Sequence, residues 1–335
     1  MASSSAPTAL SRLAMVFATA GLLLLSGVHL SSVDGQASSV HALPSLGQSV
    51  ADSSDRIDRD RLLRNLSMLA HDSMEGRRTG TVGNQRARSF LLLRFDAIRL
   101  DPVHGTRSQE FRFTGRRDGG EYEGLNIMGM IEGSEHPERY IVITAHYDHL
   151  GVSGGEIFNG ADDNASGTAA LLELGHYFRA NPPSHSLIFV AMDAEELGLE
   201  GSRTWVDVPP VPLESIALNV NLDMISRSEA GELYAAGTYH YPFLTPWVEE
   251  VAARAPVELL MGHDSPDLPP GDDWTMASDH APFHEAGIPF IYFGVEDHEG
   301  YHHPTDTFDR ITPEFYGDAV ETILDFLLLV DRDGF

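Results

Sequence analysis

Residues that could bind a metal ion occur in five short segments of this chain, and they carry histidine and carboxylate side chains but no cysteine. The segments lie at 145–149, 160–164, 193–197, 221–223 and 301–304. Such a ligand set suits a hydrolytic divalent metal better than a thiolate site would. The sequence therefore indicates a hydrolytic metal centre assembled from distant parts of the chain.

Three of these segments come at the end of an apolar, β-rich run. The runs lie at 140–144, 186–192 and 217–222, whereas the segment at 160–164 leads into a helix expected at 167–178. Open α/β sheets bind their ligands at the carboxyl ends of parallel strands. We therefore expect the metal-binding side chains to meet at one edge of a sheet.

The remaining elements alternate between strands and helices. Apolar spacing predicts further strands at 111–113, 126–131 and 289–293, and helices at 57–70, 84–98, 246–254 and from 313 onward. The stretch 226–278 is irregular and is expected to form long loops around its one helix. Together these patterns predict an α/β fold, a three-layer sandwich with a central, mostly parallel mixed sheet and helices on both faces.

The first 55 residues are expected to lie outside the catalytic domain. Arg12 precedes an apolar run at 13–25, and small residues at 35–37 offer a cleavage site, so 1–37 is predicted to be a secretory signal peptide. The run is too short for a spanning helix. A flexible linker is expected at 38–55 and one catalytic domain at 56–335. The protein should then be exported, periplasmic or extracellular, without an integral membrane anchor after cleavage.

The charge of the chain limits its partners. The formal net charge is −28, and all 22 basic residues are arginine. Nucleic acid is excluded as a partner because phosphate binding requires a basic surface. This charge composition fits either a GC-rich genome, which favours arginine over lysine, or a surface adapted to high salt. The absence of cysteine excludes disulfides and cysteine nucleophiles, and nothing indicates the oligomeric state.

The spacing within the segments fits catalysis, although each segment also has an ordinary structural explanation. His146 and Asp148 are two residues apart and would point the same way on an extended segment. Glu195 and Glu196 are adjacent, so one could bind metal while the other faces water. Asp163 could bridge two cations through its two oxygens, or it could simply cap a helix.

The ordered set of motifs resembles the co-catalytic dizinc exopeptidases, the family of aminopeptidase Y, bacterial leucyl aminopeptidases and glutamate carboxypeptidase. The resemblance covers about residues 60–335. The matching motifs lie at 74–77 with 80–81, 145–151, 163–167, 195–198 with 201–202, 221–223, 278–283, and 301–302 with 304, 306 and 307.

This resemblance implies two zinc ions, for which cobalt or manganese could substitute. The implied ligands are a bridging Asp163, His146 with Asp223 on one zinc, and Glu196 with His302 on the other. His302 matches the ligand rather than His303, because it stands four residues before Asp306. By the same resemblance Glu195 is the general base, Tyr301 donates a hydrogen bond to the oxyanion, and Asp148 orients His146.

The implied function is a secreted or periplasmic zinc-dependent exopeptidase acting on peptides. Aminopeptidase activity is favoured over carboxypeptidase activity because acidic residues that could bind a substrate ammonium are plentiful. The acidic candidates are Asp272, Asp273 and Asp279, and the arginines that could instead bind a carboxylate are Arg203 and Arg227.

Two other functions remain open on the sequence. A glutaminyl cyclase-like transferase would have a similar fold with a single zinc, but those enzymes tend to carry aspartate where this chain has Ser278. A non-catalytic binding ectodomain, as in the transferrin-receptor branch of the fold, would have lost metal ligands that this chain retains.

Overall fold

A mixed sheet forms the centre of the structure, a computed structural model that describes residues 56–269 and 271–334. Within these residues the sheet has eight strands in the spatial order β1-β2-β6-β3-β7-β10-β8-β9. Their bounds are β1 Ser108–Thr114, β2 Glu121–Ile131, β3 His136–His146, β6 His185–Met192, β7 Ile216–Leu222, β8 Glu232–Ala236, β9 Glu258–Met261 and β10 Phe290–Gly294. The four central strands β6, β3, β7 and β10 run parallel. A short hairpin of β4 Gly151–Ser153 and β5 Glu156–Phe158 lies apart from the sheet.

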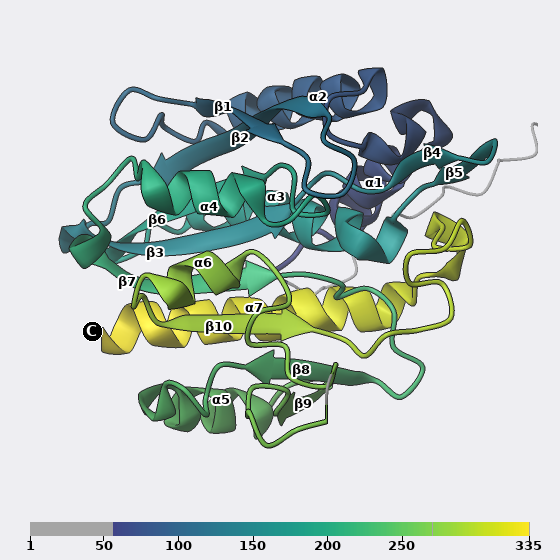
Figure 1. The fold of residues 1–335 in the computed structure, drawn as a ribbon. Coiled ribbons are helices and arrows are strands. Elements are labelled where there is room, and N and C mark those ends of the chain that lie inside the picture. Colours follow the sequence, from purple (N-terminus) through teal and green to yellow (C-terminus); the bar gives the residue numbers. More distant parts are fainter. Residues whose placement is uncertain (1–55, 270, 335) are drawn as a thin grey trace, which may run out of the picture. The chain divides into compact units, whose positions relative to one another are not determined.

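Helices cover both faces of this sheet (Figure 1). Those described are α1 Arg59–Leu69, α2 Val82–Ile98, α3 Gly167–Ala180, α4 Glu200–Asp207, α5 Thr245–Ala252, α6 His280–Glu285 and α7 Pro313–Asp333. One apolar cluster joins α1, α2, α3, α5 and α7 to the sheet, and a second joins α4 and α6 to it. The predicted three-layer α/β fold is therefore confirmed.

Side-chain alternation along the central strands supplies both apolar clusters. In β3, Ile141 and Ile143 belong to the first cluster, whereas Val142 between them belongs to the second. Successive residues of a strand point to opposite faces of the sheet. A strand segment buried on both faces is consequently apolar at nearly every position, which is why residues 140–143 of β3 and 187–192 of β6 appear in the sequence as continuous apolar runs.

The one helix expected within 226–278 is present as α5, but the prediction that loops make up the rest was wrong, because that stretch also contains β8 and β9 at the edge of the sheet. These strands have only five and four residues. Unlike β10, which is as short as β8 but buried at every position, β8 and β9 are partly exposed and so lack the continuous buried apolar run that indicates a strand. The helices α4 and α6, with eight and six residues, were also not predicted.

The predictions of a signal peptide at 1–37 and a linker at 38–55 fall outside the described residues. Among the residues described, none of the helices combines the length and the apolar composition needed to cross a membrane.

Candidate metal centre

Loops at the carboxyl ends of the parallel strands carry the candidate ligands. His146 is the last residue of β3, and Asp223 directly follows β7. Glu196 lies in the loop after β6, Asp163 in the turn that precedes α3, and His302 in the loop between β10 and α7. Three neighbouring strand ends and two loops thus contribute to the same region.

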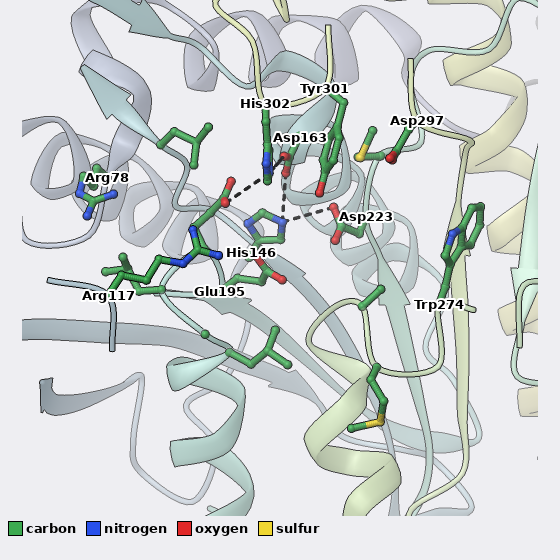
Figure 2. Close-up of a pocket in the computed structure, with 18 of the residues that line it drawn as sticks. Arg78, Arg117, His146, Asp163, Glu195, Asp223, Trp274, Asp297, Tyr301 and His302 are labelled. Carbon is green, nitrogen blue, oxygen red and sulfur yellow. Dashed lines mark hydrogen bonds and ion pairs between the residues drawn. The ribbon is translucent and has the colours of Figure 1, made fainter. Parts of the chain in front are cut away.

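The carboxylate of Asp163 lies between the other candidate ligands, with one oxygen toward each pair. Oδ1 is 3.3 Å from His146 Nε2, which is also 3.3 Å from Asp223 Oδ1. Oδ2 is 3.1 Å from His302 Nε2, which is 3.4 Å from Glu196 Oε2. The five side chains form two groups that share Asp163, and four of them are seen facing one another in Figure 2.

These separations fit a metal ion within each group. Nitrogen and oxygen ligands about 2.0–2.2 Å from a tetrahedral zinc lie roughly 3.3–3.6 Å apart. His146, Asp163 and Asp223 are buried, and within the described residues Glu196 Oε1 has no hydrogen-bond partner. Carboxylates gathered in a buried site are unfavourable without compensating cations. The donor set is therefore suited to two divalent ions.

Charge interactions among these groups favour an ionised Asp163. Burial works against its charged form, but the nearby imidazoles of His149 and His146 hold the pKa of Asp163 well below its usual value. Burial likewise opposes protonation of His146, yet the carboxylates of Asp223 and Glu195 raise the pKa of that imidazole well above its usual value. The anionic groups thus attract positive charge at this position, which metal ions could provide.

Asp148 connects the His146 side of the site to the loop that carries the glutamates. Its Oδ1 lies 3.7 Å from His146 Nδ1, beyond hydrogen-bonding distance, whereas its backbone oxygen is 3.2 Å from that nitrogen. The Asp148 carboxylate accepts hydrogen bonds from the backbone N–H groups of Glu195 at 3.1 Å and Glu196 at 3.4 Å. Asp148 therefore contacts His146 through its main chain and fixes the glutamate loop through its side chain.

Two further contacts orient the ligand carboxylates. Ser278 Oγ donates to Asp223 Oδ2 at 2.7 Å. The carboxylate of Asp306 accepts from the backbone N–H of Asp162 at 2.9 Å and from that of Asp163 at 3.0 Å. Such supporting contacts set the position of a ligand before the metal arrives.

Glu195 and Tyr301 line a cavity of about 520 Å³ above the metal-binding side chains. Burial and the neighbouring Glu196 carboxylate raise the pKa of Glu195 well above its usual value, although His146 acts in the opposite direction. The Tyr301 hydroxyl points into the cavity (Figure 2), and burial with the nearby carboxylates raises its pKa. A proton acceptor and a hydrogen-bond donor thus face the space where a substrate would bind.

Residues 126–327 match the model of peptidase family M28. That segment is more than half of the chain and contains all five candidate ligands. The chain belongs to peptidase family M28.

Similarity to individual M28-like proteins is partial in length. A protein named aminopeptidase YwaD from Bacillus subtilis is 36% identical over 203 residues, which are 56% of this chain and 41% of that protein. The chain spans about half or less of the length of the curated relatives it matches.

Solved structures share the fold at low identity. A zinc aminopeptidase from Bacillus subtilis has a TM-score of 0.66 at 19% identity, covering 80% of this chain and 94% of that one. A glutaminyl cyclase from Fimbriiglobus ruber has a TM-score of 0.65 at 21% identity, covering 82% and 96%. At such identities these structures show a common fold only.

His149 is a further histidine of this M28 centre that the sequence did not single out. Its ring is fully buried, with Nδ1 2.7 Å from Glu196 Oε1 and 3.6 Å from Asp163 Oδ2. Despite this proximity, neither ring nitrogen has a hydrogen-bond partner within the described residues. Two-residue spacing drew attention to Asp148 instead, but that alternation ends with the strand at His146.

The charged residues suggested for recognising a substrate terminus do not line the cavity. Arg203 pairs with Glu285, and Arg227 pairs with Glu299. The three acidic candidates also lie outside the cavity lining: Asp272, Asp273 and Asp279. Apart from Glu195 and the five proposed metal ligands, the charged residues that line the cavity are Arg78, Arg116, Arg117, Asp118 and Asp297.

Proposed function

We propose that this chain is a two-zinc exopeptidase that removes residues from the free N-terminus of peptides. The observation that carries the proposal is the Asp163 carboxylate, whose two oxygens face separate ligand groups. Membership of family M28 and the similarity to an aminopeptidase support it. Because the ligand set contains only nitrogen and oxygen, cobalt or manganese could replace zinc.

The cavity residues have the chemistry that peptide hydrolysis needs. Zinc ions bound here would polarise the scissile carbonyl group and lower the pKa of the attacking water. Glu195 takes the proton from that water and later delivers it to the leaving amine. The Tyr301 hydroxyl, kept protonated by its raised pKa, donates a hydrogen bond to the developing oxyanion. Asp148 positions Glu195 through the loop backbone.

Asp297 supports specificity for a free N-terminus. Its exposed carboxylate lines the cavity and has no ion-pair partner among residues 56–269 and 271–334. A substrate ammonium group would supply the missing positive charge, whereas an acylated N-terminus would not. Asp297 therefore replaces the acidic residues that the sequence suggested for this role.

A first experiment tests the role of Glu195. Glu195→Gln retains the size of the side chain but removes the proton acceptor, so turnover should fall by about 10²–10⁴-fold. Zinc content should stay unchanged, because Glu195 is not among the proposed ligands. Glu110→Gln, on the exposed part of β1, provides the matched control. A Glu195→Gln variant that is nearly as active as the native protein would contradict the assigned role.

A second experiment tests the specificity. We expect the zinc-loaded protein to cleave a leucyl peptide with a free N-terminus and to leave its N-acetylated counterpart intact. Cleavage of the acetylated peptide from its C-terminus, at the same rate as the peptide with a free N-terminus, would favour a carboxypeptidase. Cyclisation of an N-terminal glutaminyl peptide without hydrolysis would favour the transferase.

We also propose that the protein is exported, on the basis of the apolar run at 13–25. Cell fractionation should find it in the periplasm or medium, with a mature N-terminus close to residue 38. Retention of the uncleaved chain in the cytoplasm would contradict export.

A further inference from the structure

The cavity has cationic and anionic groups on opposite sides of the metal centre. Arg78 and Arg117 lie on one side and Asp297 on the other, with His146 and Asp163 between them (Figure 2). Asp223 and Glu195 add to the negative charge of the middle. In a chain with a net charge of −28, arginines beside this acidic centre need a specific explanation.

The tip of the β1–β2 hairpin, residues 115–120, carries Arg116 and Arg117 and is held in place by its own hydrogen bonds. Gly115 N–H donates to the Gly120 oxygen at 2.8 Å, and the Asp118 carboxylate accepts from Gly120 N–H at 3.0 Å. Tyr122 Oη donates to Asp118 at 2.6 Å. A tip ordered in this way can present a side chain without a large ordering cost on binding.

Among residues 56–269 and 271–334, Arg117 differs from the two neighbouring arginines in having no hydrogen-bond or ion-pair partner. Arg116 pairs with Glu200 at 3.2 Å, and Arg78 donates to Tyr122 Oη at 3.2 Å. Arg117 has neither an ion pair nor a side-chain hydrogen bond within the described part of the chain, although it lines the cavity. Its guanidinium group is therefore available to a ligand.

The ligand chemistry follows from the guanidinium group and from the position of the arginine. Guanidinium binds planar carboxylates through two parallel hydrogen bonds. Because Asp297 occupies the opposite side of the cavity, a peptide whose ammonium group faces Asp297 would extend its leaving portion toward Arg117. We propose that Arg117 binds a carboxylate on the leaving side of the scissile bond, so that the preferred substrates are short peptides. This inference rests on the proposed aminopeptidase function.

The carboxylate has two possible sources, and three substrates distinguish them. Leu-Ala has a free C-terminal carboxylate, Leu-Ala-amide has none, and Leu-Glu-amide has one only in its side chain. A leucyl residue is chosen because apolar Trp274, Met276 and Met224 line the same cavity. The native protein should cleave at least one of the two carboxylate substrates about 10-fold more efficiently than Leu-Ala-amide.

Substitutions of Arg117 show whether this preference belongs to the arginine. In Arg117→Gln the ratio of cleavage efficiencies between the carboxylate substrate and Leu-Ala-amide should fall to about one, mainly through a change in KM. Arg117→Lys should retain part of the preference, because lysine keeps the positive charge but lacks the planar guanidinium group. Arg112→Gln, on the same hairpin but outside the cavity lining, should behave like the native protein. Equal cleavage of all three substrates by the native protein, or a preference that survives in Arg117→Gln, would overturn the proposal.

A binding measurement separates this inference from the proposed function. Calorimetry with zinc-loaded Glu195→Gln compares the affinity of the three peptides without turnover, alone and combined with Arg117→Gln. Tighter binding of a carboxylate peptide that is lost on adding Arg117→Gln supports the inference, even if the native protein cleaves none of the peptides. In that case the proposed function alone would fail. Equal or absent binding of all three would overturn the inference.

Discussion

Arg77 is a buried arginine on which several segments around the metal centre depend. Its side chain is fully buried and donates to four backbone oxygens. The acceptors are Tyr147 at 2.8 Å, Leu69 at 2.7 Å, Asn159 at 2.5 Å and Gly160 at 2.9 Å. It thus ties the end of α1 to the segment after β3 and to the turn that carries Asp163. Arg77→Met removes these donors while retaining most of the side-chain length.

The size of the effect can be worked out from these contacts. Four buried carbonyls would lose a donor, at about 1–3 kcal/mol each. Burial lowers the pKa of Arg77 to about 10, so relief of the buried charge offsets roughly 3 kcal/mol of that loss. The difference leaves a loss of about 1–9 kcal/mol, so we expect Arg77→Met to lower the free energy of unfolding by about 5 kcal/mol, the middle of that range.

Urea unfolding measured for three proteins tests this value. The matched control is Arg112→Met, whose side chain is 80% exposed and makes one surface ion pair with Glu123. That control should lose less than about 1 kcal/mol. Zinc content should also fall in Arg77→Met and not in the control, because the turn before Asp163 is released. A loss in Arg77→Met no larger than that of Arg112→Met would refute the reasoning.

Further predictions concern pH and metal. Burial lowers the pKa of His280 to about 3, below the 6.5 of the unfolded chain, so its stabilising contribution is complete above pH 6.5 and is lost as pH falls toward 3. Between pH 7 and 5 the native protein should therefore lose about 2 kcal/mol more unfolding free energy than His280→Gln, and equal losses in urea titrations would contradict this. Free zinc at 100-fold above its Kd should stabilise the chain by about 2.7 kcal/mol per site. Thermal unfolding in the presence of zinc or of a chelator measures that effect, and the melting temperature of Asp163→Asn should rise less on adding zinc. Equal melting temperatures of the native protein in the two conditions would count against a metal site.

The central sheet and the ligand set could be predicted because each has a strong local signal. Residues 140–143 of β3 and 187–192 of β6 form continuous apolar runs, and β7 is buried at every position and apolar apart from Asn219 and Asn221. The polar residues that end these runs stand out for the same reason. His146 and Asp223 could therefore be assigned to one sheet edge before any tertiary contact was known.

Other features depend on tertiary contacts that have no local signal. Strands β8 and β9 are short, and they are strands because β8 pairs with β10 and β9 pairs with β8. His149 approaches Glu196 only after the chain has left β3 and turned. Arg117 lies on a hairpin tip far from every metal-binding motif, and the folding of β1 and β2 brings it to the cavity.

The central claim is that Asp163 is shared by two metal ions, and anomalous diffraction at the zinc edge from zinc-loaded crystals tests it most directly. We predict two peaks about 3.5–4 Å apart. One should lie beside His146 and Asp223, and the other beside Glu196 and His302. A single peak, or peaks that do not flank the Asp163 carboxylate, would contradict the account.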